Sequence, residues 1–406
     1  YRRQRQMCIR DRFNEGTIGF LSYSEGCNDD VNKIIWSGLG WDPQAAPETI
    51  LKSYARYFIG PRHEVVFAQG VLALEQNWVG PLLKNESVPK TLAAFQQMEK
   101  EATDAEKTNW RFQQALYRAY YDAYVQERLK YETKLEQGAL DALALAPKDG
   151  ALNAMTVSEE ILGRAQTAPV AQALRTRLFA LAEALFQSVR MQLSVPLYQA
   201  IHVERGANLD LVDYPLNDAP WLKAQFASIR KLASEKEHIA AIKTIVHWKE
   251  AGEGGYYDAF GDPEANPHLV RHPEGYPDPE FKTEPNLGRD NNDGWRYDWN
   301  RFADTRYEAP LQAHYTGLDK SANYTLRVVY AGDSMDRKIR LDADNLGVHD
   351  FLAKPNPPAP LEFDIPPAAT ADGELTLTWN QEPGRGGGGR GCQVAEVWLM
   401  KKPEQK

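Results

Sequence analysis

A carboxylate follows the first hydrophobic segment of the chain, where it could act as an acid or a base. Residues 18–23 (IGFLSY) predict a buried β-strand, and Glu25 comes directly after it. In a β/α barrel, catalytic groups lie at the carboxyl ends of the strands. Cleavage of a glycosidic bond generally needs two flanking carboxyl groups. Glu25 is therefore the candidate catalytic residue, and the binding of a sugar hydroxyl or the ordering of the turn are its alternative roles.

The polar residues around Glu25 are of types that hydrogen-bond sugar hydroxyls. Adjacent side chains diverge, so Asp29 and Asp30 do not form one paired-carboxylate site, and at least one of them is expected to cap the following helix. Lys33 stands four residues after Asp29, a spacing that also permits a surface ion pair. Aromatic rings stack on sugars, although core packing is their commoner role. The candidate ligands of this segment are Tyr23, Asn28, Asp29, Asp30, Asn32, Lys33 and Trp41.

A second group of candidate sugar ligands lies on a predicted long helix. Arg111, Gln114 and Arg118 recur at helical spacing and therefore share one face. An arginine fork suits the carboxylate of an acidic sugar. Tyr121 or Asp122 continues this face. The alternative is a solvated helix face with intrahelical pairs.

The segment WRYDW offers aromatic rings at alternating positions. If it is extended, Trp295, Tyr297 and Trp299 project from one side and form a stacking platform; the alternative is that they pack the loop onto its domain. His268 and His272 lie in a Pro-rich loop and not on a helix, so they do not make a zincin motif. Because the acids near residue 290 do not match the spacing of a calcium loop, we predict neither a metal nor a cofactor.

Composition narrows the class of protein. A length of 406 residues suggests two or three domains, and an apolar fraction of 43% permits sizeable cores. The net charge of −9 argues against a nucleic-acid partner, which needs a basic face. No run of 18 apolar residues predicts a membrane span, and three cysteines are too few for a disulfide framework. The sequence makes no prediction of an oligomeric state.

The first twelve residues differ from the rest of the chain. Residues 7–12 read MCIRDR, which resembles the conceptual translation of a transposon-type sequencing adapter. We therefore predict that residues 1–12 are a disordered artefact and leave them out of the fold prediction. A basic, disordered arm that binds nucleic acid is the alternative. Without these arginines, the body of the chain is still more acidic.

Residues 47–252 carry the 3.6-residue apolar period of helices. Pro47 and Glu48 start the first helix, and Gly60 with Pro61 stops it. Helices of such lengths with short breaks predict an antiparallel bundle. The further predicted helices lie at about residues 65–80, 92–100, 104–137, 170–195, 220–237 and 238–250.

The remaining chain changes character twice. Residues 253–309 are rich in Pro, Gly, Asp and aromatic residues without a period, which predicts a long loop region. Residues 310–403 alternate with a period of two, which predicts a β-sandwich. The tract GRGGGGRG, residues 384–391, is expected to be a flexible loop and not a phosphate loop, because no helix follows it. The predicted strands are 311–315, 324–330, 338–343, 361–365, 375–379 and 393–400.

Several segments together resemble the C-terminal portion of large bacterial carbohydrate-active proteins, in which a TIM-barrel glycosidase domain precedes a helical bundle and a β-sandwich. The architecture is similar to that of the α-glucuronidase and β-N-acetylhexosaminidase-like groups. The resemblance covers most of the chain after Phe13. The main departure from the family pattern is that the barrel expected before residue 13 is missing from this sequence. The segments that carry it are YSEGCNDDVNK (23–33), WDP (41–43), ILKSYARYFIG (50–60), YEAPLQAHYTGLD (307–319), YTLRVVYAGD (324–333) and GRGCQVAEVWL (389–399).

The resemblance implies an α+β multidomain fold. Residues 13–46 would be the last strand and loop of a truncated catalytic barrel, 47–252 the helical bundle, 253–309 the loop region and 310–403 the antiparallel sandwich. The implied function is that of a C-terminal glycoside hydrolase fragment that acts on poly- or oligosaccharide and is inactive alone. A non-catalytic carbohydrate-binding or scaffold module is the alternative, and a structural protein of a bacterial surface is a third possibility. The full-length protein is expected to be secreted or periplasmic.

Overall fold

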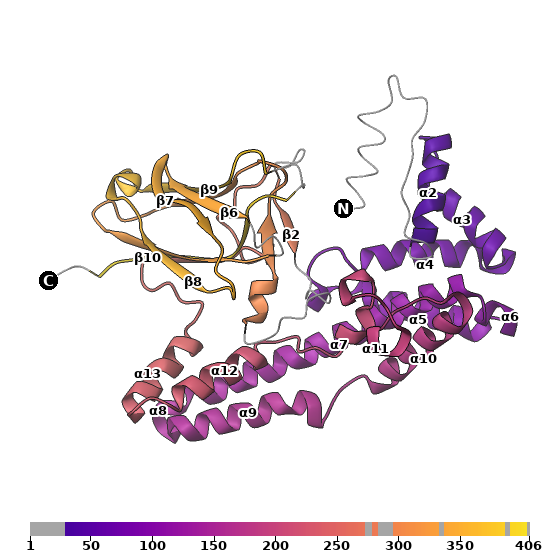
Figure 1. The fold of residues 1–406 in the computed structure, drawn as a ribbon, viewed down its shortest axis with the longest axis horizontal. Coiled ribbons are helices and arrows are strands. Elements are labelled where there is room, and N and C mark those ends of the chain that lie inside the picture. Colours follow the sequence, from indigo (N-terminus) through magenta and orange to yellow (C-terminus); the bar gives the residue numbers. More distant parts are fainter. Residues whose placement is uncertain (1–28, 273–277, 283–294, 333–336, 386–389, 404–406) are drawn as a thin grey trace. The chain divides into compact units, whose positions relative to one another are not determined.

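The computed structural model describes residues 29–272, 278–282, 295–332, 337–385 and 390–403 (Figure 1). Helices precede antiparallel sheets along the chain, which confirms the α+β fold class. The predicted strand at 18–23 lies outside the described residues, so the barrel remnant stays a prediction. Among the helices that the structure describes, none combines the length and the apolar character that a membrane crossing requires.

The chain forms two compact units. Unit 1 consists of Tyr1–Val79, Leu83–Glu127 and Ala171–Val212, and unit 2 consists of Gly80–Leu82, Arg128–Val170 and Asp213–Lys406. The predicted bundle segment 47–252 therefore contributes to both units.

Unit 1 is helical, and aromatic side chains fill its core. Phe67 lies at the centre, and its ring packs against those of Tyr54, Phe95 and Phe112 at centroid distances of 6.1 to 6.4 Å. Such contacts stabilise a core beyond the area that they bury. Its helices are α2 (Asp30–Trp41), α3 (Pro47–Phe58), η2 (Pro61–His63), α4 (Glu64–Gln76), α5 (Ser87–Glu101), α6 (Asp104–Lys107), the first part of α7 (Trp110–Ala144), α10 (Gln172–Val189), α11 (Val195–Tyr198), η4 (Val203–Arg205) and η5 (Asn208–Leu211).

The local sequence explains where several of these helices begin. Pro47 occupies the first turn of α3, where a missing N–H costs nothing. A capping box starts α6, because the Thr103 hydroxyl accepts from the Glu106 N–H while the Glu106 carboxylate accepts from the Thr103 N–H. Glu106 also pairs with Arg62 at 2.7 Å, and these contacts hold the pKa of Glu106 at about 2.

The helical part of unit 2 has a separate apolar core. Buried Leu143, Met155, Leu222, Phe226 and Ile242 come from four helices and pack together. The elements are the rest of α7, α8 (Ala146–Asp149), α9 (Ala151–Thr167), α12 (Ala219–Ile229) and α13 (Glu235–Val246), with η3 (Leu82–Lys84) at the boundary between the units. Helix α9 was not among the predicted helices.

Two antiparallel sheets form the predicted sandwich (Figure 1). Among the described residues, one sheet has the order β2-β3-β10-β5-β8 with β1 also paired to β10, and the other has the order β4-β9-β6-β7. Side chains from both inner faces, such as Leu326, Val397, Leu341 and Trp379, share one buried core. The strands are β1 (Tyr256–Ala259), β2 (Glu280–Lys282), β3 (Phe302–Asp304), β4 (Leu311–Thr316), β5 (Tyr324–Tyr330), β6 (Lys338–Ala343), β7 (Leu346–Ala353), β8 (Pro360–Asp364), β9 (Glu374–Gln381) and β10 (Gln393–Lys401).

The strands that sequence alone missed are those without a clear alternation. β1, β2 and β3 lie in the segment predicted as loop. β1 and β3 each pair with β10, more than 80 residues further on, and β2 pairs with β3. These residues form strands because of this pairing, and no local sequence pattern marks them as strands. β7 was also missed, because its residues do not alternate between buried and exposed.

Substitution of Gly261, which lies two residues after β1, tests the packing of the sandwich domain. A Cβ atom on Gly261 would overlap the backbone of Arg301 and Phe302, which cannot move aside as a flexible side chain would. We therefore expect Gly261→Ala to lower the free energy of unfolding by about 2 kcal/mol or more.

Gly163 is the matched control for this substitution. It lies within α9 with nothing near the position of an added Cβ atom. Gly163→Ala should stabilise the protein by up to about 1 kcal/mol, because alanine favours a helix. Denaturant unfolding of both variants measures the difference. Equal changes in the free energy of unfolding would show that the backbone of Arg301 and Phe302 does not lie against Gly261.

Candidate functional site

Some of the site residues predicted from the sequence lie outside the described residues, and the others lie in unit 1 or unit 2. Tyr23, Glu25 and Asn28 lie outside the described residues. Asp29 precedes α2, but its side chain makes no capping hydrogen bond to the helix. Asp30 lies in the first turn of α2, where its negative charge meets the helix dipole favourably.

Asp30 brings three helices of unit 1 together. The guanidinium of Arg111 on α7 donates from Nε to Oδ2 at 2.7 Å and from Nη2 to Oδ1 at 3.1 Å. The hydroxyl of Tyr54 on α3 donates to the same carboxylate at 2.8 Å. Burial and Asp30 raise the pKa of Tyr54 well above its ordinary value, so this hydroxyl stays protonated as a donor. The structure thus joins two predicted site residues, Asp30 and Arg111, in one contact.

Aromatic rings hold the Arg111 guanidinium in place. Its central carbon lies 3.8 Å from the ring centroid of Phe58 and 4.2 Å from that of Trp110. The fork that we expected to bind an acidic sugar is occupied by a carboxylate of the chain itself. In this structure the contact therefore links α2, α3 and α7.

Arg118 is engaged in a similar way about two turns further along the same face of α7. Its Nη2 lies 2.7 Å from Oδ1 of Asp122, and its guanidinium stacks at 4.1 Å on the ring of Trp78. Asp122 also accepts from Asn77 at 2.9 Å, and burial raises the pKa of its carboxyl. The contact is an intrahelical pair, as in the alternative for this face, but its carboxylate is buried and not solvated. Gln114 lies half-buried on the same helix.

Two aromatic rings of unit 1 are almost fully open to solvent. Trp41 at the end of α2 is 92% exposed, and Tyr57 near the end of α3 is 82% exposed. Large aromatic side chains are seldom this exposed on a folded protein. The polar candidates Asn32 and Lys33 lie half-buried on α2, the helix that ends at Trp41.

The predicted platform of WRYDW is wrong for Trp299. Residues 297–300 form the 3₁₀-helix η6 (Tyr297–Asn300) and not an extended strand, so the rings do not project from one side. Trp299 is buried, and its indole donates to Glu396 at 2.7 Å. Trp295 is half-buried and packs against the same apolar cluster, in line with the alternative of loop packing.

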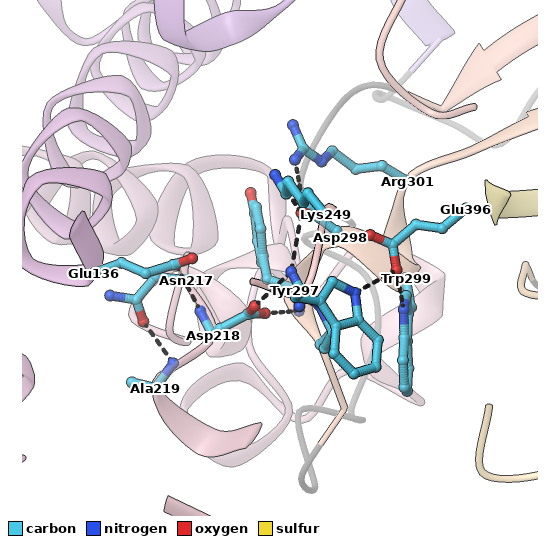
Figure 2. Close-up of polar contacts among 12 residues, drawn as sticks. Glu136, Asn217, Asp218, Ala219, Lys249, Tyr297, Asp298, Trp299, Arg301 and Glu396 are labelled. Atoms are coloured by element: carbon cyan, nitrogen blue, oxygen red, sulfur yellow. Dashed lines mark hydrogen bonds and ion pairs between the residues drawn. The ribbon is translucent and has the colours of Figure 1, made fainter. Parts of the chain in front are cut away.

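The partner of Trp299 is a fully buried carboxylate in the middle of β10. Glu396 accepts from the indole N–H of Trp299 at 2.7 Å (Figure 2). It also accepts from the indole N–H of Trp248 at 3.3 Å and from the hydroxyl of Tyr257 at 2.7 Å. A buried carboxylate is tolerated when hydrogen bonds replace its lost hydration. These contacts fasten the segment after α13 and the segment 295–301 to the outer face of the first sheet.

A network of ion pairs surrounds this carboxylate (Figure 2). Asp298 contacts Lys249 at 3.3 Å and Arg296 at 3.5 Å, and it also pairs with Arg301. These cations hold the pKa of Asp298 far below its usual range. Arg296 contacts Asp218 at 3.1 Å, and both side chains are buried.

Glu136 on α7 completes the network, and sequence reasoning missed it. Its Oε2 accepts from the backbone N–H of Asp218 at 2.9 Å. Burial and the nearby Asp218 raise the pKa of Glu136 to about 8, and burial raises the pKa of Asp218 to about 6. Glu132 and Glu136 stand four residues apart on a helix rich in tyrosine, and this spacing was the one signal available.

The carboxylates described above form ion pairs and hydrogen bonds within the chain. Within the ranges that the structure describes, no set of three or more His, Cys, Asp or Glu side chains is arranged to hold a metal ion. Asp30, Asp122 and Asp298 are each paired with arginine. Among the described aromatic residues of unit 1, the rings of Trp41 and Tyr57 are exposed to solvent.

Comparison with known proteins gives one structural relative. No family model matches this sequence, and no curated protein matches it. Among solved structures, the chain is similar to a family GH115 4-O-methyl-α-glucuronidase with specificity for decorated arabinogalactans, at 8% sequence identity and a TM-score of 0.28. The match covers 91% of this chain and 44% of that enzyme's chain, so this chain spans less than half of the enzyme's length.

The contact between Asp30 and Arg111 gives a prediction for stability. Asp30→Ala removes a carboxylate that accepts from two side chains and leaves a partly buried guanidinium unpaired. We expect the free energy of unfolding to fall by about 2 kcal/mol, measured by urea denaturation.

Glu48→Ala is the matched control, because it removes an exposed pair with Lys52 on the neighbouring helix. Such pairs contribute about 0.5 kcal/mol or less. If both variants lost the same small amount, Asp30 would not be the link between the three helices.

Proposed function

We propose that this chain is the C-terminal part of a glycoside hydrolase that acts on poly- or oligosaccharide. Hydrolysis would proceed by carboxylate acid/base chemistry in a barrel to which Glu25 contributes. The helical and sandwich parts described above would position and bind the substrate. On this proposal the chain is inactive by itself.

The observation that carries the proposal is the exposure of Trp41 and Tyr57. Rings that are 92% and 82% exposed contribute little to the core. A planar aromatic face packs well against the C–H face of a sugar ring. Both rings lie on α2 and α3, the two helices that Asp30 joins.

The burial pattern of α2 supports the barrel part of the proposal. Leu39 is the one buried residue of this fully described helix; Val31, Ile34, Ile35 and Trp36 are half-buried, and Trp41 is exposed. An apolar helix gains stability from a further apolar partner. A helix that follows a strand in a β/α unit finds that partner in the sheet.

A non-catalytic carbohydrate-binding or scaffold module is the second candidate. It is favoured by the ion pairs of Asp30 and Asp122, which occupy both carboxylates and leave neither in the role of general acid or base. Under this hypothesis the chain binds sugar without any barrel.

Turnover separates these candidates, whereas binding is common to both. Titration calorimetry of the chain against a glycan panel should show binding under either hypothesis. Turnover should appear only when the chain is joined to an upstream barrel, and Glu25→Gln in that longer protein should lower kcat at least about 100-fold. Turnover that is unchanged by Glu25→Gln would remove Glu25 from the mechanism.

The exposed rings give the sharpest test of sugar binding. Trp41→Ala and Tyr57→Ala should each weaken the affinity for a bound glycan by about five-fold, because each removes one stacking face. Folding should be unaffected, since neither ring is buried.

Ile201→Ala is the control for these two variants. Ile201 is 89% exposed in the same unit but has no planar face. An equal loss of affinity in all three variants would point to general surface hydrophobicity, and no loss in any would contradict the proposed binding surface.

A further inference from the structure

The polar network of unit 2, which is largely buried apart from the exposed Lys249 and the half-buried Glu136, contains more acids than bases. Its acidic members are Glu136, Asp218, Asp298 and Glu396, and its basic members are Lys249, Arg296 and Arg301, all within the described residues (Figure 2). A buried cluster with an unbalanced charge is costly unless one group changes its protonation state. One of the four carboxyl groups is therefore expected to carry a proton.

The contacts single out Glu136. Asp298 and Asp218 both contact arginine, and Glu396 accepts three hydrogen bonds from side chains. Glu136 has one hydrogen bond, from the backbone N–H of Asp218, and no cation within ion-pair distance among the described residues. It is the carboxylate that the structure stabilises least in its ionised form.

Glu136 also connects α7 to the turn before α12. The turn before α12 is held by two acids on successive turns of α7: Glu132 accepts from the N–H of Leu216 at 2.6 Å, and Glu136 accepts from the N–H of Asp218. Asp218 in turn contacts Arg296 and accepts from the N–H of Tyr297. The chain therefore connects α7, α12 and the segment 295–301 through this one turn.

We propose that Glu136 is a proton-dependent clamp: as a neutral acid it holds the start of α12 against α7, and loss of its proton loosens this junction. The carbonyl oxygen of the neutral acid still accepts from Asp218. An ionised Glu136 would place a second buried negative charge beside the Asp218 carboxylate, which repels it. The clamp does not depend on the proposed function in sugar hydrolysis.

The groups that face Glu136 come from every element around it. Asp218 and Asp298 oppose its ionisation, and Arg296 favours it. Glu132, one turn before Glu136 on α7, pairs with Arg128. The other charged or titratable members of the network are Lys249, Tyr257, Tyr297, Arg301 and Glu396.

The sign of the pH dependence follows from the direction of the shift. The pKa of Glu136 is raised in the folded protein, from an ordinary 4.5 to about 8, so the folded state binds the proton more tightly. Its stabilising contribution is complete below about pH 4.5 and is lost as the pH rises to about 8. Over this window the equilibrium constant of unfolding should rise by up to about tenfold per pH unit from this one proton.

Unfolding of the full chain from pH 5 to pH 9 tests the clamp. Glu136→Gln keeps the accepting oxygen and cannot ionise, so its unfolding constant should depend on pH less steeply than the wild type's, by about one proton. Glu159→Gln is the matched control: it breaks the partly exposed pair with Arg230 in the same unit and should leave this slope unchanged. A Glu136→Gln variant with the wild-type slope would overturn the proposal.

Hydrogen exchange of the wild-type chain keeps the proposal testable if a variant does not fold. After correction for the intrinsic rate, the amides of residues 216–219 should lose protection between about pH 7 and 9, whereas the amides of β5 should not. Uniform protection across this range in both segments would show that Glu136 carries no clamp.

Discussion

The buried carboxylate of Glu396 is the contact on which unit 2 depends. It lies in the middle of β10, a strand that pairs with β1, β3 and β5, and it points out of the sheet. Two indoles and a phenol donate to it, and these donors belong to the segment after α13, to β1 and to η6. A buried acid tolerates no loss of such donors. The residues around it are therefore fixed in type and position, which explains why tryptophans that looked like a sugar platform belong to the core.

Local patterns predicted those elements whose packing partners leave a local trace. The helix from Pro47 stops before Gly60 and Pro61 as expected, and β5 has the predicted bounds Tyr324–Tyr330 because its alternation is clear. β1 and β3 are short, and their existence depends on β10, so no window of a few residues reveals them. The same limit applied to WRYDW, where alternation suggested an extended strand and tertiary contacts selected a 3₁₀ turn.

The candidate site follows the same rule. Asp30 and Arg111 were both chosen by residue type, but their partnership spans 81 residues and could not be read from spacing. Arg118 and Asp122 are four residues apart, a spacing at which helical ion pairs form, and intrahelical pairs on this face were the alternative interpretation. Glu136 was not foreseen, because a glutamate on a helix has no special meaning until its surroundings exclude water. Residue type thus identified groups able to bind a sugar acid, and the structure showed which of them bind each other.

The position of β10 also has a consequence for the order in which the protein can fold during synthesis. Its residues 393–401 are made after those of every other strand, yet they pair with three of those strands in the first sheet. While β1, β3 and β5 emerge from the ribosome, the edges that β10 will occupy are open and apolar, a state prone to wrong association. The helices of unit 1 have their partners within residues that are made much earlier. The nascent chain therefore carries a folded helical unit while its sandwich still waits for the last strand.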